Sequence, residues 1–140
     1  MRPFACLSLA LAAASCRSAA VYSVTVDTSR MEQVSSGTVE GTIEVQPGGA
    51  ILARRIEVSP PRRREASGVV EVQFELRNRT LREQRFDVRF EWADAAGMNV
   101  DSPSTHWTPI VLGGNEKRPV AGTAPQLDAV RCTLKVRLSR

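Results

Sequence analysis

The sequence predicts an all-β fold, a Greek-key β-sandwich of seven or eight short strands that follows a signal peptide and a short tether. Two observations support this prediction. From Thr38 onward, apolar and polar residues alternate with a period of two, as in strands with one buried and one wet face. Turns that contain glycine or proline interrupt the alternation at short intervals, which is typical of a sandwich. No stretch after residue 20 shows a convincing helical period.

The composition of the 140-residue chain suits one globular domain. With 42% hydrophobic and 24% charged residues, it is neither disordered nor collagen-like. Three cysteines cannot form a closed disulfide framework, and a single histidine excludes every site that needs two, including the common catalytic zinc sets. We therefore expect no metal site and no cofactor.

The N-terminus has the pattern of a bacterial secretory signal. One positive charge, Arg2, precedes an apolar run over residues 3–14, which is shorter than the roughly 20 residues of a membrane span. The run ends in small residues directly before Cys16, as in lipoprotein signals. We therefore interpret residues 1–15 as a lipoprotein signal peptide and Cys16 as the lipidation site. Two or three acyl chains would make such anchoring stable.

Ordinary signal cleavage after Ala20 is the alternative, because residues 18–20 also fit the small-residue rule. Cys6 would leave with the signal in either case. Cys132 lies on the apolar side of an alternating segment, where we expect a buried, unreactive thiol. Only an uncleaved or upstream-cleaved chain would leave Cys16 free to form a disulfide with Cys132.

The remaining chain divides into a linker and a folded domain. Residues 16–37 are polar and weakly patterned, so we interpret them as the lipidated N-terminus and a tether, with a short edge strand over 21–26 as the alternative. Residues 38–140 form the predicted sandwich domain. Its expected strands are 38–45, 51–58, 70–76, 86–92, 108–112, 118–122 and 130–138, with a further short segment at 98–100.

The clearest alternation lies in the segments 70–76 and 86–92. We predict that they form one half-buried hairpin, with the aromatic and aliphatic residues of both strands, including Trp92, in the core. On its wet face, glutamates of one strand would oppose arginines of the other, with each pair contributing roughly 0.2–1 kcal/mol. These charged residues are Glu71, Glu75, Arg85 and Arg89.

A basic cluster is the first candidate binding surface. It comprises Arg54, Arg55, Arg62, Arg63 and Arg64, the last three in an expected loop over residues 60–64, since prolines 60 and 61 cannot donate to a sheet. Export and the lack of interleaved aromatic residues exclude nucleic acid as its partner. Two interpretations of the cluster remain. It is either a solvated surface loop or a surface that contacts anionic lipid headgroups or acidic cell-wall polymers.

A second candidate surface surrounds the loop over residues 94–105. It includes Asp94, Gly97, His106 and Trp107. Trp107 is expected at the rim of the core, with a ligand-facing position as the alternative. A Ser-His-Asp triad around His106 would need serines and an aspartate from the same short loop, which no scaffold would hold in place. We therefore expect no catalytic residues.

Several motifs carry a resemblance to a known family. Residues 90–98 (FEWADAAGM) look like the pattern F-x-W-x-D-x-x-G-hydrophobic of the YcfL-like family of small bacterial envelope lipoproteins, which contain a domain of unknown function. Residues 16–18, 76–78, 107–112 and 122–125 resemble further motifs of that family in the same order. The resemblance covers roughly residues 50–140 and the segment at Cys16. It implies an immunoglobulin-like sandwich, tethered to the outer membrane and facing the periplasm, without established catalytic residues.

The sequence thus predicts a non-catalytic, lipid-anchored module of the cell envelope, with binding or structural function. Residue 17 is Arg and not the Asp that favours inner-membrane retention, so we expect outer-membrane sorting. The expected partners are the membrane, through Cys16, and an unknown envelope protein or cell-wall polymer. A soluble periplasmic carrier or assembly factor, cut after Ala20, is the alternative. A hydrolase would depend on His106.

Overall fold

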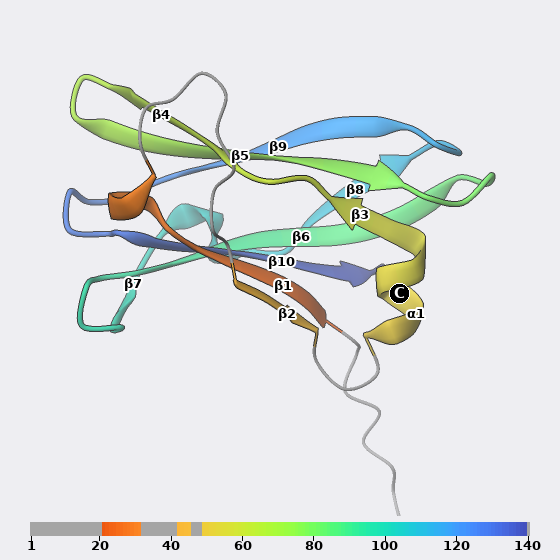
Figure 1. Cartoon of the computed structure of the whole chain (residues 1–140), viewed down its shortest axis with the longest axis horizontal. Coiled ribbons are helices and arrows are strands. Elements are labelled where there is room, and N and C mark those ends of the chain that lie inside the picture. Colours follow the sequence, from red (N-terminus) through yellow and green to blue (C-terminus); the bar gives the residue numbers. More distant parts are fainter. Residues whose placement is uncertain (1–20, 32–41, 46–48, 140) are drawn as a thin grey trace, which may run out of the picture.

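The computed structural model describes residues 21–31, 42–45 and 49–139 and arranges them as two antiparallel sheets packed face to face (Figure 1). The predicted all-β sandwich is confirmed. The strands are β1 (Val21–Asp27), β2 (Thr42–Val45), β3 (Ile56–Val58), β4 (Arg62–Ala66), β5 (Val69–Asn78), β6 (Gln84–Ala93), β7 (Asn99–Val100), β8 (Thr108–Leu112), β9 (Lys117–Thr123) and β10 (Arg131–Leu138). The helical elements are α1 (Ala50–Arg55) and two 3-10 turns, η1 (Thr28–Arg30) and η2 (Pro103–Thr105).

Each sheet is built around long central strands. The larger sheet has the order β2-β1-β10-β6, with β7 and β8 both pairing with β6. In the smaller sheet, β5 pairs with β3, β4 and β9. β9 pairs with most of the length of β5, on one edge. β3 and β4 pair with the two ends of β5, so these short strands follow one another along its other edge.

The core lies between the sheets and follows the predicted alternation. The inward residues of β5, β6 and β10 are buried: Val72, Phe74, Leu76, Phe86, Val88, Phe90, Trp92, Cys132, Leu134 and Val136. The rings of Phe74 and Phe90 meet across the interface with centroids 6.1 Å apart. Gly122 of β9 is buried beneath Phe90, where a Cβ atom would lie 2.6 Å from the ring. A glycine at this position therefore sets the close approach of the two sheets.

The predicted hairpin of residues 70–76 and 86–92 is wrong in its pairing. β5 and β6 belong to different sheets, so their inner faces oppose each other across the core (Figure 1). The expected contacts between their outward glutamates and arginines are therefore not made. Glu71 pairs with Arg64, Glu75 with Lys117, and Arg89 with Glu91 on its own strand.

The tether prediction for residues 16–37 is wrong for the described residues 21–31. Val21–Asp27 forms β1, which pairs with both β2 and β10 and therefore lies inside the larger sheet. Val24 and Val26 are buried in the core, as is Met31 after η1. The expected edge strand is thus an interior strand, and the sandwich already includes Val21–Asp27, before the predicted start at Thr38. Residues 32–37 lie outside the described residues.

The strand expected over residues 51–58 is also only partly correct. Its first part is α1, a six-residue helix that buries Leu52, and only Ile56–Val58 is a strand. The sequence shows no helical period after residue 20, and it therefore gives no indication of α1. No described helix has the length and apolar character needed to cross a bilayer. Of the strand expected at 38–45, Thr42–Val45 is described as β2 and the rest lies outside the described residues.

Candidate functional site

The three consecutive arginines are not in a loop. Arg62, Arg63 and Arg64 belong to β4, which pairs with β5 from Arg62 onward, so the expected loop over 60–64 is wrong beyond its prolines. The prolines still act as sequence reasoning suggested, because they separate β3 from β4 along one edge.

Two of these arginines are held by carboxylates. Arg64 lies opposite Glu71 and donates to both of its carboxylate oxygens, at 2.9 and 3.0 Å. Arg63 lies opposite the buried Val72, on the inner face at the sheet edge, and pairs with Glu65. An inward charge on an edge strand discourages edge-to-edge association. These contacts favour a structural role for Arg63 and Arg64.

Asp94 and Gly97 come together in the turn between β6 and β7. The Asp94 side chain accepts a hydrogen bond from the Met98 N–H at 2.9 Å, and its carbonyl accepts one from the Gly97 N–H at 3.0 Å. Gly97 has φ of 85°, a conformation that glycine adopts without strain. Both residues are therefore accounted for by turn formation.

His106 is exposed and follows η2. The hydroxyl of Ser102 accepts a hydrogen bond from the Ser104 N–H at 3.2 Å and lies 2.7 Å from the Ser104 hydroxyl. Ser102 thus caps the short helical turn, and its hydroxyl is engaged there. The structure gives no contact between His106 and either serine, and the absence of a triad stays a prediction.

Trp107 lies on the outer face of the larger sheet and not at the rim of the core. Its ring is flanked by the guanidinium groups of Arg89 and Arg137, which lie 4.6 and 4.1 Å from the ring centroid. These arginines also pair with Glu91 and Asp87. The Trp107 ring therefore forms cation–π contacts with two arginines on the charged outer face of the sheet.

The predicted site residues do not converge on one site. Arg62–Arg64 lie at an edge of the smaller sheet, Asp94 and Gly97 in a turn, and Trp107 on the outer face of the larger sheet. Cys16 lies outside the described residues. Cys132 is buried as expected, and burial raises the pKa of its thiol because it disfavours the thiolate. The described part of the chain contains no cluster of metal-binding side chains.

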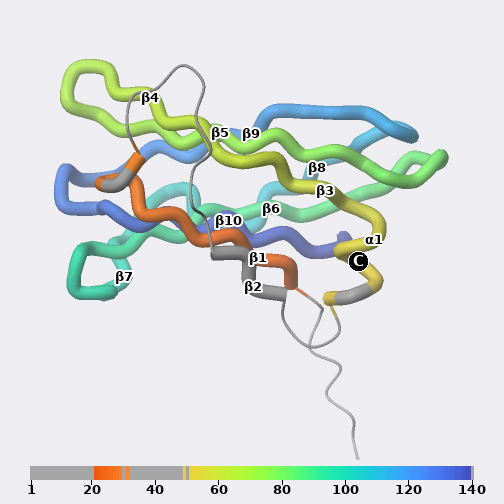
Figure 2. Tube along the Cα trace, in the orientation of Figure 1, coloured from red at the N-terminus to blue at the C-terminus, as the bar shows by residue number. Residues whose placement is uncertain are grey.

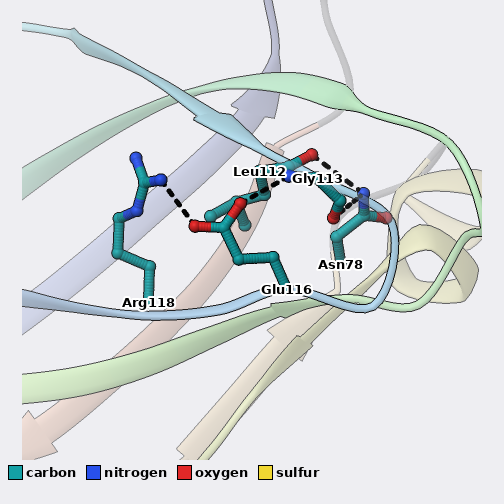
Figure 3. Close-up of polar contacts among 5 residues, drawn as sticks. All are labelled: Asn78, Leu112, Gly113, Glu116 and Arg118. Carbon is teal, nitrogen blue, oxygen red and sulfur yellow. Dashed lines mark hydrogen bonds and ion pairs between the residues drawn. The ribbon is translucent and has the colours of Figure 1, made fainter.

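Sequence reasoning missed the polar cluster around Asn78, at the end of β5 (Figure 3). This fully buried amide donates to the carbonyl oxygens of Arg82, Leu112 and Gly113, at 2.7, 3.1 and 2.9 Å. Its oxygen accepts hydrogen bonds from the Thr80 backbone N–H and hydroxyl. One side chain therefore joins the loop between β5 and β6 to the turn between β8 and β9.

Glu116 completes this cluster from the β8–β9 turn. Its carboxylate accepts the Gly113 N–H at 2.6 Å and pairs with Arg118 (Figure 3). The hydrogen bond from Gly113 and the contact with Arg118 lower the pKa of Glu116. The Glu116 carbonyl also accepts the Asn78 backbone N–H at 2.9 Å. The two loops are thereby held in a defined geometry.

The same end of the sandwich carries a second set of arginines, which we call the basic end. It is formed by the end of α1, the β5–β6 loop and the start of β6. The Arg79 N–H donates to the Arg55 carbonyl at 2.8 Å and joins the first two of these segments. The members of the basic end are Arg54, Arg55, Arg79, Arg82 and Arg85.

No guanidinium group of the basic end forms an ion pair within the described ranges. Four of the five arginines are exposed, and Arg55 is half-buried. The same helix and loop expose two apolar side chains, Ile51 at 62% and Leu81 at 86% exposure. Sequence reasoning grouped Arg54 and Arg55 with residues 62–64 by proximity along the chain. Only the fold brings them to residues 79–85.

Comparisons with known proteins agree with this fold. The family described as a protein of unknown function (DUF1425) matches residues 43–138. A DUF1425 family member from Shewanella sp. pv-4 has a similar structure, with a TM-score of 0.56 and 26% identity over 61% of this chain and 79% of its own. Campylobacter jejuni cj0090 also matches, with a TM-score of 0.47 and 16% identity over 61% of this chain and 88% of its own.

No curated protein is significantly similar to this chain in sequence. The family match covers every described strand from β3 to β10 and begins within β2, so β1 lies before it. The match spans more than half of the 140 residues. The chain therefore belongs to the DUF1425 family, whose function is unknown.

Proposed function

We propose that this protein is a non-catalytic module of the bacterial cell envelope, anchored by lipid at Cys16 to the outer membrane and facing the periplasm. The observation that carries the proposal is the position of β1. The first described strand begins at Val21, five residues after the cysteine that ends the signal-like segment. A lipid on Cys16 would therefore hold the folded domain within about 18 Å of the bilayer. The resemblance to YcfL-like lipoproteins supports the same assignment.

The chemistry of the described residues supports a binding or structural function over catalysis. The serines beside His106 are engaged in a helical cap, and the Cys132 thiol is buried. A shallow apolar depression of about 130 Å³ lies beside Val69 and Leu127. It is smaller than the roughly 300–1,000 Å³ of small-molecule sites. Recognition would then use sheet edges or end loops, with an envelope protein or cell-wall polymer as partner.

A soluble periplasmic carrier or assembly factor remains the second candidate. Cleavage after Ala20 would place the new N-terminus at Val21, the first residue of β1. The mature protein would then have no acyl chain and would fractionate with soluble periplasmic proteins.

Metabolic labelling with a radioactive fatty acid tests the anchor, combined with separation of inner and outer membranes. Wild-type protein should incorporate label and sediment with the outer membrane, whereas Cys16→Ser should not be labelled. Cys6→Ser is the matched control, because this cysteine lies in the expected signal peptide and its loss should leave labelling unchanged. Label that is unaffected by Cys16→Ser, or unlabelled wild-type protein in the soluble periplasm, would contradict the proposal.

A further inference from the structure

We propose that the basic end docks the sandwich onto anionic lipid headgroups of the membrane in which Cys16 is anchored. This inference rests on the proposed lipid anchor. It concerns the orientation of the domain, which the anchor alone does not determine.

The chain enters the sandwich at the basic end. Val21 lies opposite Arg137 in the register of β1 and β10, and Leu138 lies opposite Phe86 at the start of β6. Figure 2 shows the start of β1 close to α1 and to the C-terminal end of the chain. Five residue steps separate Cys16 from Val21, which span at most about 18 Å when extended. An anchor at Cys16 therefore keeps this end near the headgroups.

The charge of this end matches an anionic surface. Elsewhere most described arginines are neutralised by carboxylates, as in the pairs of Arg64, Arg118 and Arg137. The arginines of the basic end have no such partner among the residues that the structure describes. Glu83 is the exposed carboxylate of the same loop, while Glu116 is engaged with Gly113 and Arg118. A net positive, unpaired surface within a Debye length of anionic lipids is attracted to them.

The apolar residues of this end suit the headgroup region. Ile51 is exposed on α1, the helix that also carries Arg54 and Arg55, and Leu81 is exposed in the β5–β6 loop between Arg79 and Arg82. Apolar side chains surrounded by cations are typical of segments that lie in the membrane interface. An acidic polymer would use the arginines alone and would leave both apolar side chains in water. The combination therefore favours a lipid surface over a cell-wall polymer.

The surface is also held in place. Asn78 binds the carbonyl of Arg82, and the Arg79 N–H binds the carbonyl of Arg55, so loop and helix have fixed positions. The arginines thus extend from a rigid framework, and docking needs little further ordering of the backbone.

An environment-sensitive fluorophore on a single introduced cysteine tests the orientation. Leu81→Cys reports on the basic end, and Leu127→Cys is the matched control, since both leucines are 86% exposed. Leu127 lies in the connection between β9 and β10, and its side chain lies beside Gly68 in the β4–β5 turn. Figure 1 shows this turn at the end of the sandwich opposite to α1. Cys132 is buried and Cys16 would be acylated, so neither competes for the label. The lipidated protein is reconstituted in vesicles of phosphatidylcholine, with or without phosphatidylglycerol.

We expect the emission of the Leu81→Cys probe to shift to the blue only with phosphatidylglycerol, and to return at high salt. The Leu127→Cys probe should not shift. The double variant Arg82→Glu/Arg85→Glu should lower the ratio of docked to undocked protein by about 25-fold or more. Each arginine near an anionic surface contributes about fivefold to this ratio, and the two contributions multiply. Arg62→Glu/Arg131→Glu has the same net charge and should leave docking unchanged. It replaces two exposed arginines that form no ion pair with any described residue.

The inference is overturned if both probes respond alike, if neither responds, or if the two double variants weaken the response equally. A Leu81→Cys shift caused by soluble cell-wall fragments, but not by phosphatidylglycerol, would likewise overturn it. Flotation with pure phosphatidylcholine vesicles reports on the lipid anchor alone. Protein that floats without a shift therefore contradicts docking, whereas protein that does not float contradicts the proposed anchor.

Discussion

Asn78 is a single buried side chain that joins two loops far apart in sequence. Its amide donates to the carbonyl groups of Arg82, Leu112 and Gly113. Buried polar groups without hydrogen bonds are costly, so such a residue stabilises the loops that it joins. The sequence places Asn78 at the end of an alternating segment, but nothing in its local pattern indicates that it is buried.

Asn78→Ala should therefore destabilise the protein by about 2–4 kcal/mol, because it removes the hydrogen bonds of one buried amide to three carbonyl groups and to Thr80. Asn78→Asp should cost at least as much, since a carboxylate oxygen would then face those carbonyls. Asn99→Ala, on exposed β7, is the control and should change stability by less than about 0.5 kcal/mol. Urea unfolding measures all three. An Asn78→Ala variant as stable as Asn99→Ala would contradict this role.

The burial of Cys132 should make the free energy of unfolding depend on pH. Burial raises the pKa of the thiol in the folded state, while the unfolded thiol ionises near pH 8.5. The folded state then binds more protons, so the free energy of unfolding should fall with rising pH above about 8.5, by up to about 1.4 kcal/mol per pH unit. This contribution is fully present at lower pH. Denaturation of wild-type protein and Cys132→Ala between about pH 8.5 and 9.5 compares the slopes. Equal slopes would refute the effect.

The packing of strands across the core depends on Phe90 and Gly122. A Cβ atom on residue 122 would lie 2.6 Å from the Phe90 ring, so one of the two sheets would have to shift. Gly122→Ala should cost about 1–3 kcal/mol through overpacking. Ala121→Ser, exposed on the same strand, is the control.

The double variant Gly122→Ala/Phe90→Leu should be more stable than the sum of the single changes predicts, by about 0.5–3 kcal/mol, because a smaller side chain relieves the clash. Thermal and urea unfolding give these values. Additive effects would show that the two residues do not act on one another.

The individual strands were largely predictable, but their partners were not. Alternation identifies the buried face of β5, β6 and β10 correctly, because a half-buried strand has a period of two whichever sheet contains it. The same pattern cannot distinguish a hairpin from two strands that face each other across a core, and this explains the wrong pairing of β5 and β6. The helix α1 is only six residues long, too short for a periodic signal.

Among the site residues, sequence reasoning found those that are close together in the chain. Arg62, Arg63 and Arg64 attracted attention by their density, yet two of them are paired with glutamates. The basic end combines α1 with the β5–β6 loop, which are separated by the whole of β3, β4 and β5. Their proximity depends on sheet topology, and no local pattern contains that information.

β1 lies before the family match, yet it pairs over seven residues with β10 and over four with β2. A chain that starts at Thr28 should therefore lose cooperative folding, because β10 loses a partner and the core loses Val24 and Val26. A chain that starts at Val21 is the reference. Circular dichroism melting and hydrogen exchange compare the two chains. Equal melting midpoints would show that β1 is dispensable.

The whole molecule has two different ends. The chain enters at the basic end, while the β6–β7 turn and the turn between β4 and β5 lie at the other (Figure 1). If the basic end faces the membrane, these turns project into the periplasm, where a partner can reach them. In this orientation the anchored N-terminus and the unpaired arginines lie on the same, membrane-facing side of the domain.

The most direct measurement is the intact mass of the mature protein extracted from membranes. The account predicts a chain that begins at Cys16 and carries a diacylglyceryl group, with or without a further acyl chain. An unmodified chain that begins at Val21 would contradict the lipid anchor and favour the soluble periplasmic alternative.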